Sequence, residues 1–338
     1  MTSNSQDRYS RQERFAALGP EGQQRLGRSR AVIVGCGALG SFHASSLARA
    51  GVGFLRLVDR DYVEWNNLQR QWLYEESDAR DSVPKAVAAA RALARINSTI
   101  TVEPEIADLN ARNADDLLAG IDLILDGCDN FETRYLINDY AVRHSIPWIY
   151  GAAVSSYGIV MPILPNETAC LRCLYPNPPS VAQDTCETAG VLNALTGAVA
   201  ALQSGFALQV LSGNKPPRKI TTLDVWSGPI RQTAQPGPQS DCPACARHEF
   251  PYLEEKNRAP ISLCGRNAVQ IHERARPIDL LSLQARLQGL GEIRANEFAL
   301  RFSTGPYDLT VFPDGRAIIK GTTDPGIARG LYARYVGA

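Results

Sequence analysis

A glycine-rich turn directly after a run of β-branched residues constrains the fold of this chain more than any other feature. The run Arg30-Ala-Val-Ile-Val ends at Gly35, and Gly35-Cys-Gly37-Ala-Leu-Gly40 then opens a helical pattern. Asp59 ends the next apolar run. Glycines let the backbone approach a phosphate or a ribose, a helix start presents unpaired N–H groups, and an acid at a strand tip accepts ribose hydroxyls. We predict that these three glycines and Asp59 bind a nucleotide; the motif alone leaves NAD, FAD and ATP open.

Strands and helices alternate over the first half of the chain. Apolar runs typical of strands lie at residues 30–35, 54–58, 100–106, 121–125 and 147–150. Helical patterns lie at residues 9–26, 38–50, 85–96, 111–118 and 133–144. This order specifies right-handed crossovers with helices on both faces of the sheet. We therefore predict an α/β fold with a doubly wound, Rossmann-like and mostly parallel sheet.

The pattern changes after residue 152. Extended segments at 157–164, an uncharged stretch at 189–214 and a strand at 219–225 complete a first domain, residues 1–248. A linker at 249–260 contains Pro251 and Pro260. Residues 261–338 read as a small α+β domain with a strand at 262–272, a helix at 278–287, a hairpin through 313–315 and a closing helix from 325.

Charge and hydropathy exclude several classes of partner. The chain has 35 basic and 35 acidic residues, so no overall attraction to nucleic acid or to an anionic membrane is expected. Residues 1–19 are polar and contain no apolar core of signal-peptide length, which predicts a cytoplasmic protein. The uncharged stretch exceeds the roughly 20 residues that cross a bilayer, but amides and glycines interrupt it, so we predict a buried core helix.

Polar side chains cluster where loops leave the carboxyl ends of the predicted strands. They are Asn66, Asn67, Arg70, Lys85, Asp129 and Asn130. Arg70 and Lys85 would neutralise a triphosphate, and Asp129 would hold a bridging magnesium ion. This set favours phosphoryl or nucleotidyl transfer over hydride transfer. Taken singly, such cations are more often solvated surface charges and Asp129 could be a helix cap; it is their joint placement that favours the functional interpretation.

Two pairs of cysteines lie outside the nucleotide-binding pattern. Cys170-Leu-Arg-Cys173 and Cys242-Pro-Ala-Cys245 have the spacing at which two sulfur atoms reach one metal ion. Four thiolates would complete a tetrahedral zinc site and leave no position for water, so the zinc would be structural. The alternative is a redox dithiol, for which one pair would suffice. His248 is interpreted as a bystander.

The other cysteines divide into two groups. Cys186 lies in a polar segment at residues 183–190, outside any apolar period, and is a candidate nucleophile. Cys36, Cys128 and Cys264 lie in or beside apolar runs and are predicted to be buried and inert.

These motifs together resemble the ThiF/MoeB/HesA family, relatives of ubiquitin-activating enzymes. The resemblance covers about residues 8–248. The segments that carry it are Arg8-Tyr-Ser-Arg-Gln12, the turn from Gly35 to Gly40, Asp59, Asn66-Asn-Leu-Gln-Arg70, Pro84-Lys85, Asp126-Gly-Cys-Asp-Asn130, both cysteine pairs and Thr185-Cys186-Glu187. It implies ATP-dependent adenylylation of the C-terminal glycine of a ubiquitin-like sulfur carrier, ThiS for thiamin or MoaD for molybdopterin.

The resemblance also implies roles for individual residues. Gly37, Asp59, Asn67, Arg70 and Lys85 would bind ATP, and Asp129 would hold magnesium. Arg11 would reach the phosphates bound to a neighbouring subunit, which implies a homodimer. Cys186 would form a thioester or an acyl-disulfide link with the carrier in some members of the family, and a donor such as a cysteine desulfurase would supply sulfur.

Departures from the family pattern refine these expectations. The turn before Lys85 reads Asp81-Ser-Val83 where the family usually has a glycine, so a local difference in the backbone is expected. No rhodanese-like pattern follows residue 250. The stretch at 262–271 is similar to the C-terminal extension of long ThiF-type proteins, which favours ThiS over MoaD, with Cys264 as a structural residue. The alternatives are a NAD-dependent oxidoreductase and a relative that acts on a peptide or on tRNA.

Overall fold

The computed structural model describes residues 8–178, 188–254, 262–263, 268–272 and 277–337. The chain divides into two compact units, Met1–Lys256 and Asn257–Ala338. Cys186 and Cys264 lie outside the described residues, so the expectations for both stay untested.

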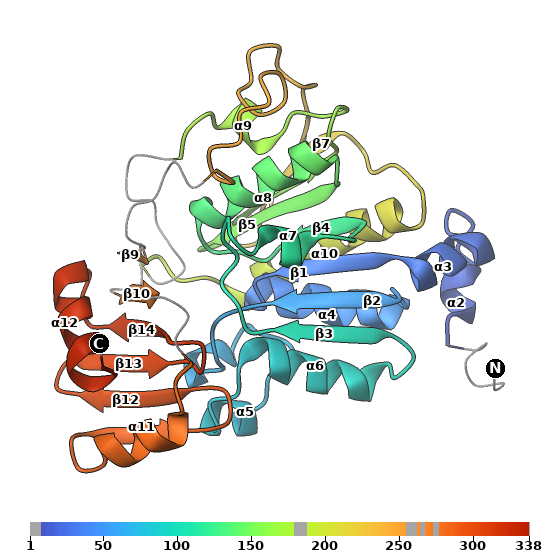
Figure 1. Cartoon of the computed structure of the whole chain (residues 1–338). Helices are drawn as coiled ribbons and strands as arrows, with labels where there is room; N and C mark the ends of the chain where they lie inside the picture. Colours follow the sequence, from blue (N-terminus) through green and yellow to red (C-terminus); the bar gives the residue numbers. More distant parts are fainter. Residues whose placement is uncertain (1–7, 179–187, 255–261, 264–267, 273–276, 338) are drawn as a thin grey trace. The chain divides into compact units, whose positions relative to one another are not determined.

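An eight-stranded sheet in the order β3-β2-β1-β4-β5-β6-β7-β8 forms the centre of the first unit (Figure 1). The first five strands are parallel, and β6 to β8 continue the sheet as antiparallel neighbours. The predicted mostly parallel, Rossmann-like sheet is thereby confirmed. Its strands are β1 (Arg30–Val34), β2 (Phe54–Val58), β3 (Thr101–Glu105), β4 (Leu123–Asp126), β5 (Trp148–Val154), β6 (Tyr157–Ile163), β7 (Lys219–Asp224) and β8 (Ile230–Ala234).

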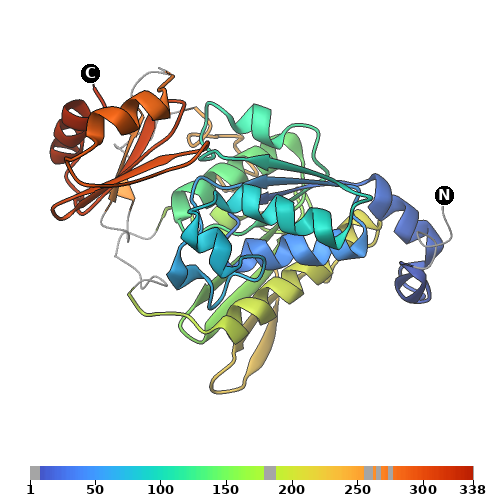
Figure 2. The same ribbon diagram turned by 90° about the horizontal axis from the view of Figure 1, so that it is seen from below.

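Helices cover both faces of this sheet. Its larger helices are α3 (Gly19–Arg28), α4 (Ala38–Ala50), α6 (Lys85–Ile96), α8 (Phe131–His144) and α10 (Asn193–Leu211). Short helical turns are α2 (Ser10–Glu13), η1 (Trp65–Asn67), α5 (Glu76–Arg80), α7 (Ala114–Leu118) and α9 (Leu171–Leu174). Helices α4, α6 and α10 pack side by side on one face (Figure 2), and α7 and α8 lie on the other.

The strands supply the two cores because successive side chains point to opposite faces. In β1, Ala31 and Ile33 pack with α4 and α10, whereas Val32 and Val34 pack with α7 and α8. All four are buried. A strand that is buried on both faces reads as a continuous apolar run, which is why the sequence pattern located the parallel strands well.

Several predicted elements differ in extent from the structure. The helix predicted at 9–26 is two helices, because Gly19 (φ 63°) turns the chain between them. The strand predicted at 147–150 continues to Val154 and pairs with β6 along its whole length. The edge strand β8 was not predicted, because all five of its residues are exposed and show no apolar alternation.

Helix α10 is the uncharged stretch of the sequence. It is long and apolar enough by composition to cross a membrane, and half of its most apolar window is buried inside the first unit. Leu195, Val199 and Ala207 pack on α4 and on the sheet. These contacts are those of the predicted core helix.

The second unit contains a six-stranded antiparallel sheet in the order β11-β12-β13-β14-β10-β9. Its strands are β9 (Ser262–Leu263), β10 (Ala268–His272), β11 (Glu292–Ala295), β12 (Leu300–Thr304), β13 (Tyr307–Val311) and β14 (Arg316–Lys320). Helices α11 (Leu280–Leu287) and α12 (Pro325–Tyr335) pack on one face around Phe302. The hairpin at 313–315 joins β13 to β14 as predicted. The single strand expected at 262–272 is wrong: β9 and β10 are separate strands that pair antiparallel.

Candidate nucleotide site and metal centre

The predicted nucleotide-binding glycines have three different surroundings. Gly35 has φ 89°, a conformation that L residues rarely adopt. A Cβ atom on Gly40 would lie 1.7 Å from the Gly35 carbonyl oxygen, so Gly40 allows α4 to pack against the turn. A Cβ atom on Gly37, the N-cap of α4, would meet nothing within 4 Å. Gly37 therefore borders open space at a helix N-terminus, which is the surrounding that an approaching phosphate requires.

Asp59 is buried directly behind the glycine turn. Its carboxylate accepts hydrogen bonds from the backbone N–H groups of Cys36 at 2.6 Å and Asp61 at 2.7 Å. Burial raises the pKa of Asp59, and the nearby ammonium group of Lys85 opposes that shift. One carboxylate thus joins the glycine turn to the segment that follows β2.

Lys85, the first residue of α6, faces the same edge of the sheet. Its Nζ lies 3.1 Å from Oδ2 of Asp61, and its side chain is almost fully buried. Tyr74 donates a hydrogen bond to the Cys36 carbonyl at 2.6 Å and so links the segment before α6 to the glycine turn. The sequence reasoning did not single out Asp61 or Tyr74; the acid two residues after Asp59 was the available signal for the first.

The turn before Lys85 contains Ser82 with φ 49°. This is the left-handed region that favours glycine, so a serine here adopts the backbone conformation that a glycine would adopt more readily. The turn therefore forms with a serine in a backbone conformation that favours glycine.

The asparagines and the arginine after β2 form a self-contained turn. Asn67 is buried; its Oδ1 accepts a hydrogen bond from the Glu64 N–H at 3.0 Å, and its Nδ2 donates to Asn66 Oδ1 at 2.7 Å. Arg70 donates to the Asn66 carbonyl at 2.7 Å. The side chain of Asn67 therefore shapes the turn, while Asn66 is exposed and Arg70 half-buried.

The loop from Asp126 to Asn130 leaves β4 beside the glycine turn. The Gly127 N–H donates to the Val34 carbonyl at 2.8 Å, and a Cβ atom on Gly127 would lie 2.3 Å from the Gly35 carbonyl oxygen. Asp129 is exposed at the tip of the loop. Asn130 caps α8 by accepting a hydrogen bond from the Thr133 N–H at 2.8 Å. The cap is therefore Asn130 and not Asp129.

The structure thus gathers most of the predicted site residues at the carboxyl edge of the sheet. The glycine turn follows β1, Asp59 follows β2 and the Asp129 loop follows β4, and these strands are neighbours in the sheet. Ligands of doubly wound folds bind at this edge, where the strand order reverses.

Arg11 is the exception. Helix α2 lies at the C-terminal ends of α4 and α6, away from the glycine turn. Gln12 donates to the Ala50 carbonyl at 2.9 Å, and Arg8 donates to the Ile96 carbonyl at 3.0 Å. Ala50 ends α4, whose 13 residues span about 20 Å at roughly 1.5 Å per residue. Arg11 therefore lies about one helix length from Gly37 of its own subunit.

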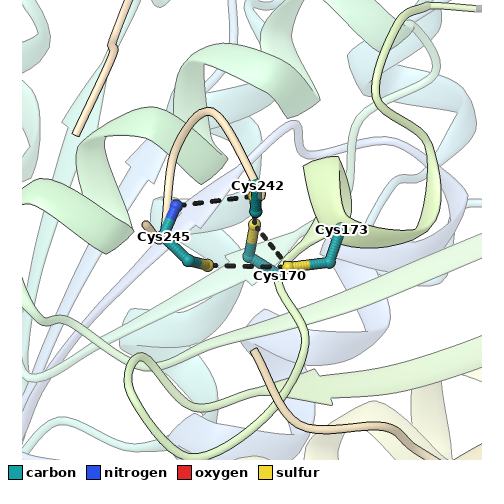
Figure 3. Close-up of side chains that lie close together, drawn as sticks. All are labelled: Cys170, Cys173, Cys242 and Cys245. Carbon is teal, nitrogen blue, oxygen red and sulfur yellow. Dashed lines mark hydrogen bonds between the residues drawn. The ribbon is translucent and has the colours of Figure 1, made fainter. Parts of the chain in front are cut away.

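The four paired cysteines converge on one point (Figure 3). The Sγ atoms of Cys170 and Cys242, of Cys170 and Cys173, and of Cys173 and Cys245 are each 3.7 Å apart, and all four lie within 4.8 Å of one another. A zinc–sulfur distance of about 2.3 Å in a tetrahedron requires sulfur–sulfur distances of about 3.8 Å. The cluster therefore fits a metal ion bound by four thiolates.

Two further cysteines are buried, as predicted. Burial raises the pKa of Cys36 and of Cys128 well above the ordinary thiol value. Neutral, enclosed thiols are poor nucleophiles. Both residues serve as packing in the two loops that carry them.

Comparison with solved structures identifies the class of fold to which this chain belongs, by similarity alone. Its fold resembles that of Escherichia coli MccB in a crystal structure described with ATP, with a TM-score of 0.62 and 23% sequence identity over 71% of this chain and 74% of that one. The structure of PaaA is similar with a TM-score of 0.56. These likenesses establish the fold.

Sequence comparisons establish the family. The ThiF family pattern matches residues 9–244, and the chain belongs to the ThiF family. It is 41% identical to the sulfur carrier protein ThiS adenylyltransferase of Bacillus subtilis over 98% of this chain and 99% of that protein. It is 39% identical to the sulfur carrier protein adenylyltransferase of Thermus thermophilus over 72% of this chain and 92% of that one. The chain is accordingly an adenylyltransferase.

Proposed function

We propose that this enzyme uses ATP to adenylylate the C-terminal glycine carboxylate of a ubiquitin-like sulfur carrier, with ThiS of thiamin thiazole biosynthesis as the substrate. The observation that carries the proposal is the identity with a ThiS adenylyltransferase over nearly the whole of both chains. That match includes the second unit, whereas the match to the Thermus relative covers 72% of this chain.

The proposed reaction begins with ATP at the carboxyl edge of the sheet. The open N-terminus of α4 at Gly37 would receive phosphate oxygens, and Asp59 would bind the ribose. Lys85 and Arg70 would neutralise the triphosphate. The carrier carboxylate would attack the α-phosphorus in line, pyrophosphate would leave, and a carrier acyl-adenylate would result. The protein contributes mainly by positioning these groups and by neutralising their charge.

Magnesium would be held by Asp129. This carboxylate is exposed and stands at the tip of its loop, within the same edge as the glycine turn, and carboxylate oxygens suit magnesium. The ion would supply charge neutralisation for the departing pyrophosphate. Asn130 would serve mainly as the cap that fixes the loop.

The metal bound by the four cysteines would be zinc in a structural role. All four positions around the metal are filled by protein sulfur, so no position is left for substrate or water. Thiolate ligands also require that the protein works where cysteines stay reduced.

Arg11 would act in a neighbouring subunit. Its own site is about 20 Å away at the far end of α4, so a contact with phosphate requires a second copy of the chain. We therefore propose a homodimer with shared sites. Mixing Arg11→Ala subunits with Asp129→Ala subunits should restore one working site per mixed dimer; absence of any recovered activity would count against the shared site.

The body of the carrier would dock on an apolar rim formed by Tyr157, Leu192, Trp226 and Ile230. All four side chains are exposed, Trp226 by 80%. Backbone pairing gathers them at the carboxyl edge: Tyr157 is opposite Asp224, Ile230 is opposite Leu223, and the Leu192 N–H donates to the Ser155 carbonyl at 3.1 Å. An exposed aromatic and aliphatic cluster beside a reactive site is typical of a protein-binding surface.

Sulfur transfer would follow adenylylation. A donor such as a cysteine desulfurase would present sulfur as a persulfide, whose terminal sulfur displaces AMP and forms an acyl disulfide with the carrier. A second thiol would then attack the S–S bond, leaving a disulfide with the donor and releasing the carrier thiocarboxylate. Cys186, which lies outside the described residues, is proposed to carry the covalent link on the basis of the family resemblance.

Carrier-dependent ATP–pyrophosphate exchange tests the proposal. Purified ThiS and MoaD from the same organism would be compared, with carriers that lack the last glycine as controls. Exchange with ThiS alone is expected. Exchange with MoaD alone would replace the substrate by the molybdopterin carrier, and exchange with neither would leave the peptide or tRNA alternative.

Two variants separate chemistry from docking. Asp129→Ala should lower exchange by about a hundredfold or more, with unchanged thermal stability.

Trp226→Ala should raise KM for the carrier about tenfold and leave ATP affinity unchanged, because large aromatic residues dominate protein interfaces. Leu281→Ala removes a comparably exposed apolar side chain in the second unit and serves as the control. A loss of the dimer in Trp226→Ala would instead assign the rim to the subunit interface.

A further inference from the structure

Helix α8 contacts both the proposed nucleotide site and the cysteine cluster. Its N-cap is Asn130, the neighbour of Asp129, and its second and third turns face the segment that carries the first cysteine pair. The family comparison assigns no role to the helix between these points.

Arg134 holds the loop that carries Asp129. Its Nε lies 2.9 Å from Asp126 Oδ2, and its Nη2 donates to the carbonyls of Cys128 at 2.7 Å and Gly151 at 2.9 Å. Asp126 also accepts a hydrogen bond from the Cys128 N–H at 2.8 Å. Both charged side chains are buried. A buried ion pair that also donates to two backbone carbonyls holds its surroundings in one geometry, because displacement of either partner leaves a buried charge uncompensated.

The next turns of α8 hold the first cysteine pair. Asn138 Oδ1 accepts a hydrogen bond from the Leu171 N–H at 2.8 Å, and Asp139 Oδ1 lies 3.3 Å from Arg172 Nη1. Leu171 and Arg172 are the two residues between Cys170 and Cys173. The side chains of Asn138, Asp139 and Arg172 are buried. Tyr135 adds a hydrogen bond to the Tyr175 carbonyl at 2.7 Å.

The segment after the second cysteine pair reaches the same side chains. Arg172 also donates to the Glu249 carbonyl at 2.9 Å, and the Tyr252 N–H donates to Asp139 Oδ2 at 3.3 Å. Asp139 therefore joins α8 to both chain segments that bind the metal. Asn138 and Asp139 are one turn of helix beyond Arg134 and Tyr135, so the two sets of contacts move with one rigid element.

We propose that α8 is a brace between the two sites: the metal-bound cysteines fix α8 through Asn138 and Asp139, and α8 fixes the Asp129 loop through Arg134. Asn138, Asp139 and Arg134 are positioning residues, none of which contacts the nucleotide. The consequence for ATP rests on the proposed function; the mechanical link does not. By reciprocity, bound ATP strengthens metal binding by the same factor by which bound metal strengthens ATP binding.

Hydrogen exchange of the full chain tests the link without using activity. Removal of the metal with a chelator should increase amide exchange in residues 126–136 together with residues 168–175, while β2 stays protected. An increase confined to residues 168–175 and 240–254 would overturn the brace. Equal loss of protection throughout the first unit, β2 included, would also overturn it, because the coupling would then be ordinary unfolding.

The Asp139→Asn variant tests the link to ATP. Asparagine keeps the shape of the side chain and removes the charge that balances Arg172. In the wild type, saturating MgATP should raise the affinity for zinc, measured at equilibrium by competition with a colorimetric chelator, by at least about fivefold. Asp139→Asn should abolish this difference, whereas Arg143→Gln, an exposed change on the same helix, should retain it. An undiminished difference in Asp139→Asn would overturn the proposal; wild-type protein that binds no MgATP would instead overturn the proposed function, with the hydrogen-exchange result unaffected.

Discussion

The nucleotide edge and the cysteine cluster are built by opposite means. At the nucleotide edge, the backbone determines the packing. The absence of side chains at Gly35, Gly40 and Gly127 allows the turn after β1 to pack directly against the loop after β4 and against α4. At the cluster, four side chains from two short segments meet at one point beside a hydrophobic core, and a metal would bind the two segments together. The comparison teaches that the packing of the first region depends on backbone space at its glycines, whereas that of the second depends on four particular side chains.

Loss of one thiolate should have the largest effect. Cys173→Ser removes one of four metal ligands, and the binding free energy of a structural metal is folding free energy. We expect loss of stoichiometric metal and destabilisation on the order of 4 kcal/mol, or roughly 10 °C in Tm. Metal content and thermal unfolding measure both. Full metal occupancy with unchanged Tm would show that Cys173 is not a structural metal ligand.

Added volume in the glycine turn should come next. Gly40→Ala places a methyl group against the Gly35 carbonyl, so we expect destabilisation of about 3 kcal/mol. Gly37→Ala enters open space and should change stability by less than about 0.5 kcal/mol while weakening ATP binding. Denaturant unfolding and ATP titration on both variants would distinguish them. Equal stability of the two would contradict the division of roles within the turn.

Acid should lower the free energy of unfolding by an intermediate amount, through His43 on α4. His43 is fully buried on α4 with Nε2 3.1 Å from Gln203 Oε1, and burial lowers its pKa from 6.5 to about 3. The unfolded chain is therefore protonated first, so the stability that depends on neutral His43 is complete above pH 6.5 and is lost as pH falls toward 3. The slope is at most about 1.4 kcal/mol per pH unit, or about 2 kcal/mol at pH 5.

The same pH range protonates thiolates, so this measurement is made on metal-saturated protein between pH 5 and 6.5. His43→Gln retains a donor toward Gln203 and removes the titrating group. Its unfolding free energy should fall less steeply with decreasing pH than that of the wild type. The difference in slope should correspond to at most one bound proton. Parallel slopes for the two proteins would rule out His43 as the source.

Relief of backbone strain should have the smallest effect. Ser82 has φ 49° in the turn before Lys85. Ser82→Gly removes a conformational cost of about 1–2 kcal/mol but increases the entropy of the unfolded chain, leaving a net gain of about 0.5–1 kcal/mol. A decrease in Tm would indicate that the contacts of the serine side chain contribute more than the backbone strain costs. ATP affinity should not change.

The buried parallel strands and the metal cluster were predictable from the sequence because each depends on local signals. Continuous apolar runs located β1, β2 and β4, and the two pairs of cysteines carry their ligand spacing in four residues each. The exposed edge strand β8 and the division of residues 9–26 into two helices were not, because their placement depends on pairing with β7 and on the turn at Gly19. The roles proposed for Arg70, Lys85, Asp129 and Arg11 stay predictions.

The sequence by itself determined the order of strands and helices, the glycine turn and the residue types that the chemistry requires, because these follow from periodicity, turn preference and ligand spacing along the chain. Only the tertiary structure decided which residues meet. It placed Arg11 a helix length from the glycine turn, gave the cap of α8 to Asn130 and left Asp129 exposed. It also brought Asp139 to Arg172 and Arg134 to Asp126, because burial of charge is stable only where distant segments supply the partner.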